Sequence, residues 1–210
     1  MRLYMIRHAE SVANLSPELV CGQSTETPLS ELGIGQAMDL GATLAESGLQ
    51  PDRVYSSPAQ RALLTARFCL ESAGINRVPL FDERLHEVSQ GEWEGLVRAE
   101  MWTDAVKAEA GLLQADFKVP GGESVNEAQD RITSFMDELA STQPKDATVF
   151  AFGHGFVTRI AAGSLLGWSY DHTRLADTPN TSVSLFEHDG KQWQVGFVGQ
   201  AGFEPAPAEA

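Results

Sequence analysis

The most constraining feature of the sequence is the short run at residues 147–152, which reads ATVFAF. Almost every position in it is apolar, without the alternation of a half-exposed strand. Such a run is typical of a strand that a parallel sheet buries on both faces. Two further strands are predicted at residues 2–7 and 52–57. Segments with helical spacing separate the strands, so we expect a sheet built from strand–helix–strand units.

Helix starts are predicted where capping residues precede an apolar stripe. Ser30 is expected to open a helix that runs to about residue 48, and Ser124 with Glu127 forms a capping box. Ser57, followed by Pro58 in the first helical position, is expected to cap another helix. The remaining predicted segments are helices at 96–110 and 156–166, a short strand at 77–81 and an irregular stretch at 82–95.

The segment 181–198 reads as a β-hairpin with Asp189 and Gly190 in its turn. It adds antiparallel pairing at one edge of the sheet. We therefore predict the α/β class, as a three-layer α/β/α sandwich whose mainly parallel central sheet has an antiparallel edge strand. The hairpin could also pair with a second copy of the chain, so a homodimer stays open.

The length of the chain suits a single domain. It has 210 residues, of which 42% are hydrophobic, and this is enough for a substantial core. No repeat or linker interrupts residues 1–203, so we predict one domain there. The last residues, 204–210, read EPAPAEA and have the composition of a disordered tail.

The balance of charge limits the classes of partner. The chain has 15 Lys and Arg residues against 29 Asp and Glu residues, which gives a formal net charge of −14. Nucleic acids and anionic membranes need a basic surface, so neither is an expected partner. A small anionic substrate is compatible with this charge, because a few buried arginines can hold a phosphate inside an acidic protein.

Cysteine usage and hydropathy indicate the compartment. Cys21 and Cys69, the two cysteines of the chain, lie far apart and without metal-ligand spacing. They predict neither a disulfide framework nor a metal site, so a reducing compartment is the simpler assumption. The apolar run at residues 3–6 is too short for a signal peptide, and no stretch approaches the length of a membrane span. We expect a cytoplasmic protein.

Polar residues directly follow three of the predicted strands. Arg7 and His8 end the first strand, SSPAQR at 56–61 ends the second, and GHG at 153–155 ends the third. Ligands of such sheets bind beyond the carboxyl ends of the strands, so these groups are expected to converge on one rim. A single histidine at a strand end is more often structural, and the coincidence of three such segments is what favours a site.

Two arginines, two histidines and a helix N-terminus at one point would suit a phosphate dianion. Arg7 and Arg61 can hold phosphate oxygens with planar guanidinium groups, and a glycine such as Gly155 beside His154 allows close approach of a ligand to the backbone. The sequence contains no Walker-type loop and no carboxylate cluster suited to Mg²⁺. We therefore expect phosphate chemistry without a metal or cofactor, on a protein nucleophile such as a neutral imidazole.

Five segments together resemble the histidine phosphatase superfamily, also called the phosphoglycerate mutase-like family. Each segment alone is a weak signal, whereas the set in this order is highly specific. The segments cover nearly the whole chain and are RHAESVAN at 7–14, SSPAQRALLTA at 56–66, EVSQGEWEG at 87–95, PGGES at 120–124 and GHG at 153–155.

The resemblance implies a role for each matching residue. His8 matches the nucleophile that becomes phosphorylated. Glu87 matches the proton donor, which supplies the proton that an alkoxide leaving group needs. The phosphate-binding positions implied by the resemblance are Arg7, Asn14, Arg61 and His154. Three other acids, Glu83, Glu92 and Glu94, rival Glu87 by proximity alone.

One loop departs from the family. GQSTETPLS at 22–30 has one residue more than many members, and Glu26 stands where they have Asp. The candidate substrate-binding residues are Cys21 and Gly22, which lie at the start of this loop, and Gly155.

The resemblance covers both phosphatases and mutases, and it implies extra basic residues in a long insert after WEG for a mutase. Between Gly95 and Gly121 the chain has only three cations, Arg98, Lys107 and Lys118, against four acids. We therefore predict a metal-independent phosphomonoester hydrolase that acts through a phosphohistidine on a small phosphorylated metabolite. A phosphoglycerate mutase-type phosphotransferase is the alternative, and a phosphoprotein phosphatase or a non-catalytic phosphate-binding module fits less well.

Overall fold

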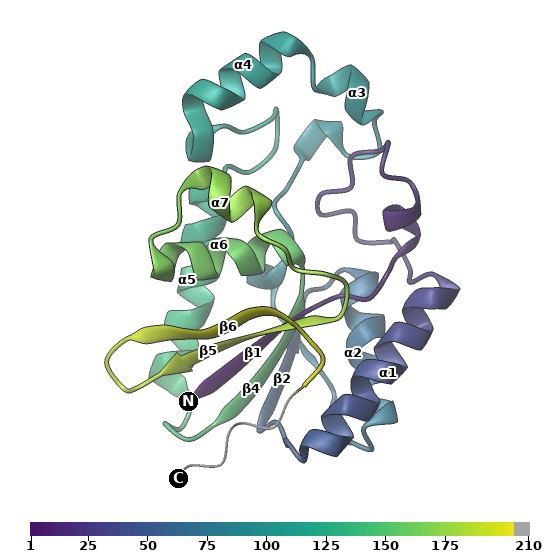
Figure 1. The fold of residues 1–210 in the computed structure, drawn as a ribbon, viewed down its shortest axis with the longest axis vertical. Helices are drawn as coiled ribbons and strands as arrows, with labels where there is room; N and C mark the ends of the chain where they lie inside the picture. The colour runs from purple at the N-terminus through teal and green to yellow at the C-terminus, as the bar shows by residue number, and fades with distance from the viewer. Residues whose placement is uncertain (204–210) are drawn as a thin grey trace.

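The computed structural model describes residues 1–203, which are built on one six-stranded sheet (Figure 1). The strand order is β3-β2-β4-β1-β5-β6; the first four strands are parallel, and β5 and β6 follow antiparallel. The predicted α/β class with an antiparallel edge is confirmed. The predicted tail at 204–210 lies outside the described residues. The strands span β1 Arg2–Arg7, β2 Arg53–Ser56, β3 Leu80–Phe81, β4 Thr148–Gly153, β5 Ser182–His188 and β6 Trp193–Ala201.

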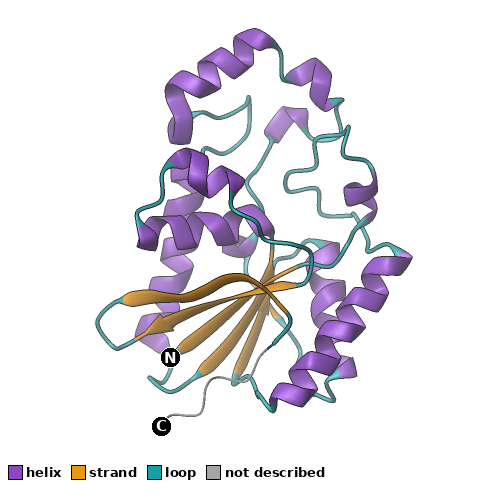
Figure 2. Ribbon diagram, viewed as in Figure 1, coloured by secondary structure: helices purple, strands orange, loops and turns teal. Residues whose placement is uncertain are grey.

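Helices cover both faces of the sheet (Figure 2). Helices α1 and α2 pack on one face, α5 and α6 pack on the other, and α7 lies beside α6. Helices α3 and α4 stand apart from the sheet, beyond the carboxyl ends of its parallel strands (Figure 1). The helices span α1 Glu31–Ser47, α2 Gln60–Ser72, α3 Arg98–Met101, α4 Asp104–Leu113, α5 Val125–Thr142, α6 Gly155–Leu166 and α7 Tyr170–Leu175, with 3₁₀ turns at Val12–Leu15, Glu83–Leu85, Gly91–Trp93 and Gln114–Asp116.

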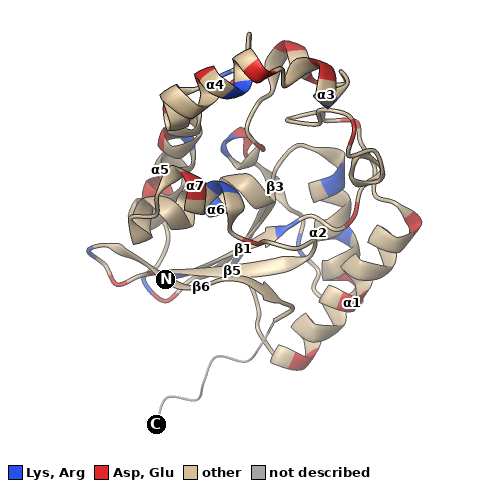
Figure 3. Ribbon diagram, turned by 45° about the horizontal axis from the view of Figure 1, so that its top comes forward, with Lys and Arg blue, Asp and Glu red and all other residues tan. Residues whose placement is uncertain are grey.

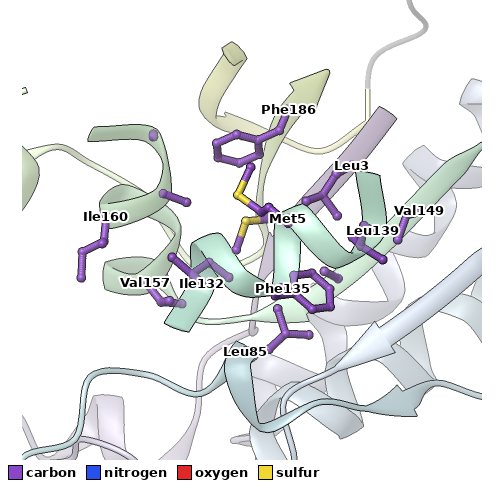
Figure 4. Close-up of a cluster of buried hydrophobic side chains, with 14 of the residues drawn as sticks. Leu3, Met5, Leu85, Ile132, Phe135, Leu139, Val149, Val157, Ile160 and Phe186 are labelled. Carbon is purple, nitrogen blue, oxygen red and sulfur yellow. The ribbon is translucent and has the colours of Figure 1, made fainter. Parts of the chain in front are cut away.

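Each face of the sheet has its own hydrophobic core, because side chains alternate along a strand. Leu3 and Met5 of β1 point into the cluster around α5 and α6 that Figure 4 shows, whereas Tyr4 and Ile6 point towards α1 and α2. β4 is buried along its whole length, as its apolar run predicts. Burying one large apolar side chain stabilises a fold by roughly 1.5–3 kcal/mol. β1 and β4 are therefore firmly held strands on which to mount reactive groups.

The predicted cap at Ser57 is wrong. Helix α2 starts at Gln60, its N-cap is Ala59, and no side chain caps it. Ser57 instead continues the course of β2, since its backbone N–H donates to the Phe152 carbonyl at 2.8 Å. Its hydroxyl lies 3.0 Å from Nε2 of His154 and 3.3 Å from Nδ1 of His86. Partners from distant parts of the chain have taken the group that would otherwise cap the helix.

We call the segment 96–119 the lid. The sequence predicts one helix at 96–110, but the structure has two helices there with a break between them. Helix α3 ends at Met101, and α4 begins after Thr103, whose extended backbone and side chain cap it. The lid is held to the preceding turn by aromatic contacts, with ring centroids of Trp93 and Trp102 5.5 Å apart and those of Trp102 and Phe117 5.7 Å apart.

Two other expectations concern the helices. The capping box of α5 is confirmed: the Ser124 hydroxyl accepts from Glu127 N at 3.1 Å, and the Glu127 carboxylate accepts from Ser124 N at 2.8 Å. Helix α7 was not anticipated, because its six residues are too few for a periodic pattern. No helix within residues 1–203 combines the length and the apolar character that crossing a membrane requires.

Candidate active site

A pocket of about 620 Å³ opens at the carboxyl ends of β1, β2 and β4, with the lid on its far side. In Figure 3, basic positions lie near the ends of β1 and α2 and on α6, while acidic positions are spread over the outer helices. Cys21 and Gly22 line the pocket, whereas Gly155 does not. The pocket brings together all the predicted catalytic and phosphate-binding residues, His8, Glu87, Arg7, Asn14, Arg61 and His154.

His8 follows β1 directly and is 6% exposed. Its backbone N–H donates to the Gly153 carbonyl at 2.9 Å, which ties it to the end of β4. Nδ1 lies 2.7 Å from the Ala9 carbonyl, and a carbonyl can only accept, so Nδ1 carries the proton and Nε2 the free electron pair. Burial, with the charges of Arg61 and Arg7, lowers the pKa of His8 to about 3. The ring is therefore neutral near pH 7 and nucleophilic at Nε2.

Arg7 is held under the loop that follows α7. Its Nη1 donates to the Thr178 carbonyl at 2.6 Å, and its buried Nε has no partner within residues 1–203. Burial lowers the pKa of this guanidinium, and the nearby Glu87 carboxylate opposes that shift. Gly155 makes room for the side chain: a Cβ at this position would lie 3.1 Å from Arg7 Cδ. The structure thus gives Gly155 a part in placing Arg7 rather than in lining the pocket.

Arg61 in the first turn of α2 is 2% exposed. Its Nη1 donates to the Ser24 carbonyl at 2.6 Å, and its Nη2 donates to the Gly22 carbonyl at 3.0 Å. Gly22 has φ +54°, and Glu94 fills the space where a side chain would stand. The loop after Cys21, which differs from the family pattern, is therefore hydrogen-bonded to Arg61. Three of the five N–H groups of the guanidinium are left for a ligand.

Asn14 belongs to the 3₁₀ turn that follows β1. Its Oδ1 accepts from Ser11 N at 2.9 Å and from the Ser11 hydroxyl at 3.0 Å. These bonds occupy the acceptor end of the amide. The donor end, Nδ2, stays available to an anion in the pocket that Asn14 lines.

His154 follows β4 and is fully buried. Its ring centroid lies 5.3 Å from that of His8, with an angle of 67° between the two ring planes. Nε2 contacts the Ser57 hydroxyl, and Nδ1 has no partner within residues 1–203. Burial, with the charge of Arg61 next in importance, lowers the pKa of His154 well below its ordinary value. This second imidazole is also neutral near pH 7.

Glu87 lies at the N-terminus of α6. Its Oε2 accepts from Phe156 N at 3.0 Å, and its Oε1 accepts from Val157 N at 3.0 Å and from Val88 N at 3.1 Å. These bonds aim the carboxylate while leaving it without a cationic partner among the ion pairs of residues 1–203. Glu123, the other pocket acid, pairs with Arg131 at 2.7 Å.

The rivals of Glu87 lie elsewhere. Glu83, Glu92 and Glu94 do not line the pocket. The Glu94 carboxylate accepts from Gln23 N at 2.8 Å and from Gln90 N at 3.0 Å, so it joins the two loops that carry them. Glu94 therefore stabilises the wall of the pocket.

Sequence reasoning missed two cations of the pocket, Arg159 on α6 and Arg174 on α7. Arg159 Nη1 donates to the carbonyls of Arg174 and Ala176, and its buried Nε has no partner within residues 1–203. A signal was available, because Arg159 is the single charge in the otherwise uncharged helix GFVTRIAAGSLL. Six of the chain's 15 Lys and Arg residues line this pocket, against two acids: Arg7, Arg61, Arg98, Lys118, Arg159 and Arg174.

The two buried neutral histidines predict acid sensitivity of the fold. In the unfolded chain His8 and His154 regain an ordinary pKa near 6.5, so below that pH the unfolded state binds more protons than the folded state. The contribution of these histidines to the free energy of unfolding is therefore complete above about pH 6.5. As the pH drops towards about 5, each histidine lowers that free energy by roughly 1.4 kcal/mol per pH unit. Urea unfolding across this range measures the slope, and His8→Gln should reduce it by roughly 1.4 kcal/mol per pH unit. A flat profile would contradict the buried neutral state.

Comparisons with known proteins agree with this geometry. The model of the histidine phosphatase superfamily (branch 1) matches residues 3–200. A fructose-2,6-bisphosphatase TIGAR of Xenopus tropicalis is 30% identical over 198 residues, which are 89% of this chain and 70% of the relative. A probable phosphoglycerate mutase GpmB of Salmonella newport is 26% identical over 92% of this chain and 87% of its own.

Among solved structures, a mycobacterial glucosyl-3-phosphoglycerate phosphatase superposes with a TM-score of 0.79 at 28% identity, over 95% of this chain and 98% of its own. The family indicated by the five motifs is thus confirmed along the chain. The protein is a member of the histidine phosphatase superfamily, branch 1.

Proposed function

We propose that the protein is a metal-independent phosphomonoester hydrolase that acts through a phosphohistidine on small phosphorylated metabolites. The single observation that carries the proposal is the state of His8: a neutral imidazole whose Nδ1–H is bound to the Ala9 carbonyl, so that Nε2 carries the electron pair. Arg7 and Arg61 line the same pocket, and the charges of both act on His8. A nucleophile near two cationic donors suits attack on a phosphate dianion.

The first half-reaction moves the phosphoryl group to His8. Nε2 attacks phosphorus, the bond from phosphorus to the leaving oxygen breaks, and Glu87 gives that oxygen a proton. The equatorial oxygens receive N–H bonds from the arginines, Asn14 and His154, which stabilise the charge of the transition state. The products are an alcohol and a phosphohistidine.

Water completes the cycle. The Glu87 carboxylate takes a proton from water as its oxygen attacks phosphorus, and the bond between phosphorus and Nε2 breaks. Phosphate leaves, His8 regains its free electron pair, and Glu87 is again protonated for the next substrate. Throughout, the Nδ1–H bond to the Ala9 carbonyl keeps the ring aimed at phosphorus.

The substrate we propose carries negative charge beyond its phosphoryl group. Arg7 and Arg61 suffice for one phosphate, yet Arg159 and Arg174 add charge to the same pocket from a different part of the chain. Lys118 pairs with Glu127 and Arg174 pairs with Asp171 at 3.7 Å, whereas the buried Nε of Arg159 has no partner within residues 1–203. The name of one relative, a fructose-2,6-bisphosphatase, denotes a substrate with two phosphates. This likeness supports the proposal.

The mutase alternative gains one argument from the same residues. The count of cations in the lid alone, which favours a phosphatase, omits Arg159 and Arg174. A second anionic group is what a phosphoglycerate mutase binds as well as its phosphate. Hydrolase remains our proposal, because the lid has only three cations, Arg98, Lys107 and Lys118, against four acids, and its two lysines pair with Asp104 and Glu127.

The proposal includes a cytoplasmic enzyme that works without nucleic acid. Cys21 and Cys69 form no disulfide, and a reducing compartment keeps such thiols free. A homodimer through the hairpin of β5 and β6 stays a prediction, which analytical ultracentrifugation would test.

Hydrolysis in the presence of a chelator tests the function. We expect the purified protein to release phosphate from p-nitrophenyl phosphate at an unchanged rate in excess EDTA, since every proposed catalytic group is a side chain. A screen of phosphorylated metabolites by kcat/KM, with a mutase assay in parallel, then ranks substrates. Loss of turnover on chelation would rule out the metal-free mechanism, and phosphate binding without turnover would indicate a non-catalytic module.

Arg159→Met tests the second anion. We expect KM for 3-phosphoglycerate to rise roughly 10- to 100-fold, as for loss of one hydrogen bond to a charged group. The KM for glycerol 3-phosphate, which has a hydroxymethyl group in place of the carboxylate, should hardly change. Arg67→Met on the exposed side of α2 is the matched control. Equal effects on both substrates would show that Arg159 does not bind the carboxylate of the leaving group.

A further inference from the structure

Three side chains form a hydrogen-bonded row behind the pocket. His154 Nε2 lies 3.0 Å from the Ser57 hydroxyl, and that hydroxyl lies 3.3 Å from His86 Nδ1. Ser57 and His154 have no exposed surface, and His86 is half-buried. The reaction described above uses neither Ser57 nor His86. In a buried row of three polar groups, each proton must be donated to a partner, because an unpaired polar group is costly there.

The Ser57 hydroxyl has one proton and must direct it to one side. The Ala59 N–H already donates to the Ser57 oxygen at 3.3 Å, so this oxygen has accepted one bond. In one arrangement Ser57 donates to His154 and accepts from His86 Nδ1–H. In the other, His154 Nε2–H donates to Ser57, which then donates to His86.

The buried nitrogen of His154 decides between them. A neutral imidazole carries one N–H, and His154 Nδ1 has no partner within residues 1–203. If Nε2 held the proton, Nδ1 would present an electron pair to a phosphoryl oxygen in a pocket whose cations select anions. If Ser57 donates to Nε2, the proton is on Nδ1 and can be donated to that oxygen.

We propose that His86 is a positioning residue, whose Nδ1–H donates to Ser57 so that the Ser57 hydroxyl donates to His154 Nε2 and fixes the Nδ1–H form of His154. The claim that this N–H meets a phosphoryl oxygen rests on the function proposed above. The choice between the two directions rests on it as well, because only a phosphoryl oxygen at Nδ1 separates the two arrangements, but the form of His154 can be measured in the protein without substrate. His86 supplies the first proton of the row and touches no substrate.

The surroundings of His86 are consistent with this part. Arg131 donates to the His86 carbonyl at 3.0 Å and so anchors its backbone. Burial and the charge of Arg131 lower the pKa of His86, against the opposing effect of Glu83. Arg61 and Glu94 are the other charged groups that act on the ring. Nδ1 can donate from either the neutral or the charged ring, so the row does not depend on protonation of His86.

The test measures the form of His154 directly. In the full-length protein with ¹⁵N-labelled histidines, NMR separates protonated from unprotonated ring nitrogens, and the chain has five histidines to assign. His154→Gln identifies the signals of His154 by their loss. We expect Nδ1 protonated and Nε2 unprotonated in the wild type. Protonation on Nε2 would overturn the proposal.

Three variants extend the test to function. His86→Phe removes the donor, His86→Asn keeps an N–H near the place of Nδ1, and Ser57→Ala interrupts the row. We expect His86→Phe and Ser57→Ala to shift His154 towards the Nε2–H form and to weaken binding of inorganic phosphate roughly 10- to 100-fold, as for loss of one hydrogen bond to a charged group. His86→Asn should retain both properties.

The controls separate the possible failures. Thermal melting establishes that each variant folds, and if Ser57→Ala does not, the half-buried position of His86 carries the test. Equal phosphate affinity and an unchanged His154 form in His86→Phe would refute the role of His86. A wild type that has the Nδ1–H form and binds phosphate, but hydrolyses nothing, would refute the proposed hydrolase and leave the row standing.

Discussion

Replacing His8 by alanine is expected to abolish phosphatase activity, with a fall in kcat of roughly 10⁴-fold or more. The reason lies in the geometry of one ring. Its Nδ1–H donates to the Ala9 carbonyl, so Nε2 is the ring nitrogen that can attack phosphorus. Steady-state release of p-nitrophenol from p-nitrophenyl phosphate measures the loss. His188→Gln, in the hairpin and away from the pocket, is the matched histidine control.

The intermediate provides a second readout of the same change. Rapid quenching into alkali preserves a phosphohistidine, because its bond from phosphorus to nitrogen is cleaved by acid. We expect label from a phosphorylated substrate on His8 of the wild type and none on His8→Ala. Full activity in His8→Ala, or label on another residue, would remove His8 as the nucleophile.

Glu87→Gln should separate substrates by their leaving groups. For an alkyl phosphate we expect kcat/KM to fall roughly 10²- to 10⁴-fold, because an alkoxide leaves poorly without a proton. The loss on p-nitrophenyl phosphate should be much smaller, since p-nitrophenolate leaves unaided. A series of phosphate monoesters with graded leaving-group acidity gives the measurement as the slope of log kcat/KM.

The control for Glu87 is a neighbouring carboxylate with a mechanical part. A glutamine at position 87 also places an amide against the N–H groups of Phe156 and Val157, so some loss is structural. Glu94→Gln disturbs the bonds to Gln23 and Gln90, and we expect it to slow all substrates by a similar factor. If Glu87→Gln behaved in the same uniform way, Glu87 would not be the acid.

Much of this architecture could be predicted because the signals are local and strong. The run at 147–152 requires burial on both faces, and β4 is buried throughout. The capping box at Ser124 involves residues three apart and forms as predicted. The convergence of Arg7, His8, Arg61 and His154 follows from topology, because parallel strands that alternate with helices end at the same edge.

The failures occur where distant contacts outweigh local preference. Ser57 followed by Pro58 is a good helix start, but hydrogen bonds to His86 and His154 hold its hydroxyl elsewhere. Arg159 could be noticed as an isolated charge, yet its place in the pocket depends on carbonyls of the following turn. The GHG motif predicts that Gly155 meets the ligand, and only the structure shows that Thr178 and Arg7 lie against the place of its missing side chain.

The separation between sheet and lid has a consequence for how the protein tolerates partial disorder. His8 and His154 are attached to the ends of β1 and β4, among the most buried strands of the molecule, whereas α3 and α4 bury little. Amide protons of such strands exchange only through global opening, while thin peripheral elements open far more often. Mild stress therefore opens the lid, which lines the far side of the pocket, long before it reaches the nucleophile. As the protein is destabilised, selectivity among substrates should be lost first, and hydrolysis of a phosphate ester should be lost last.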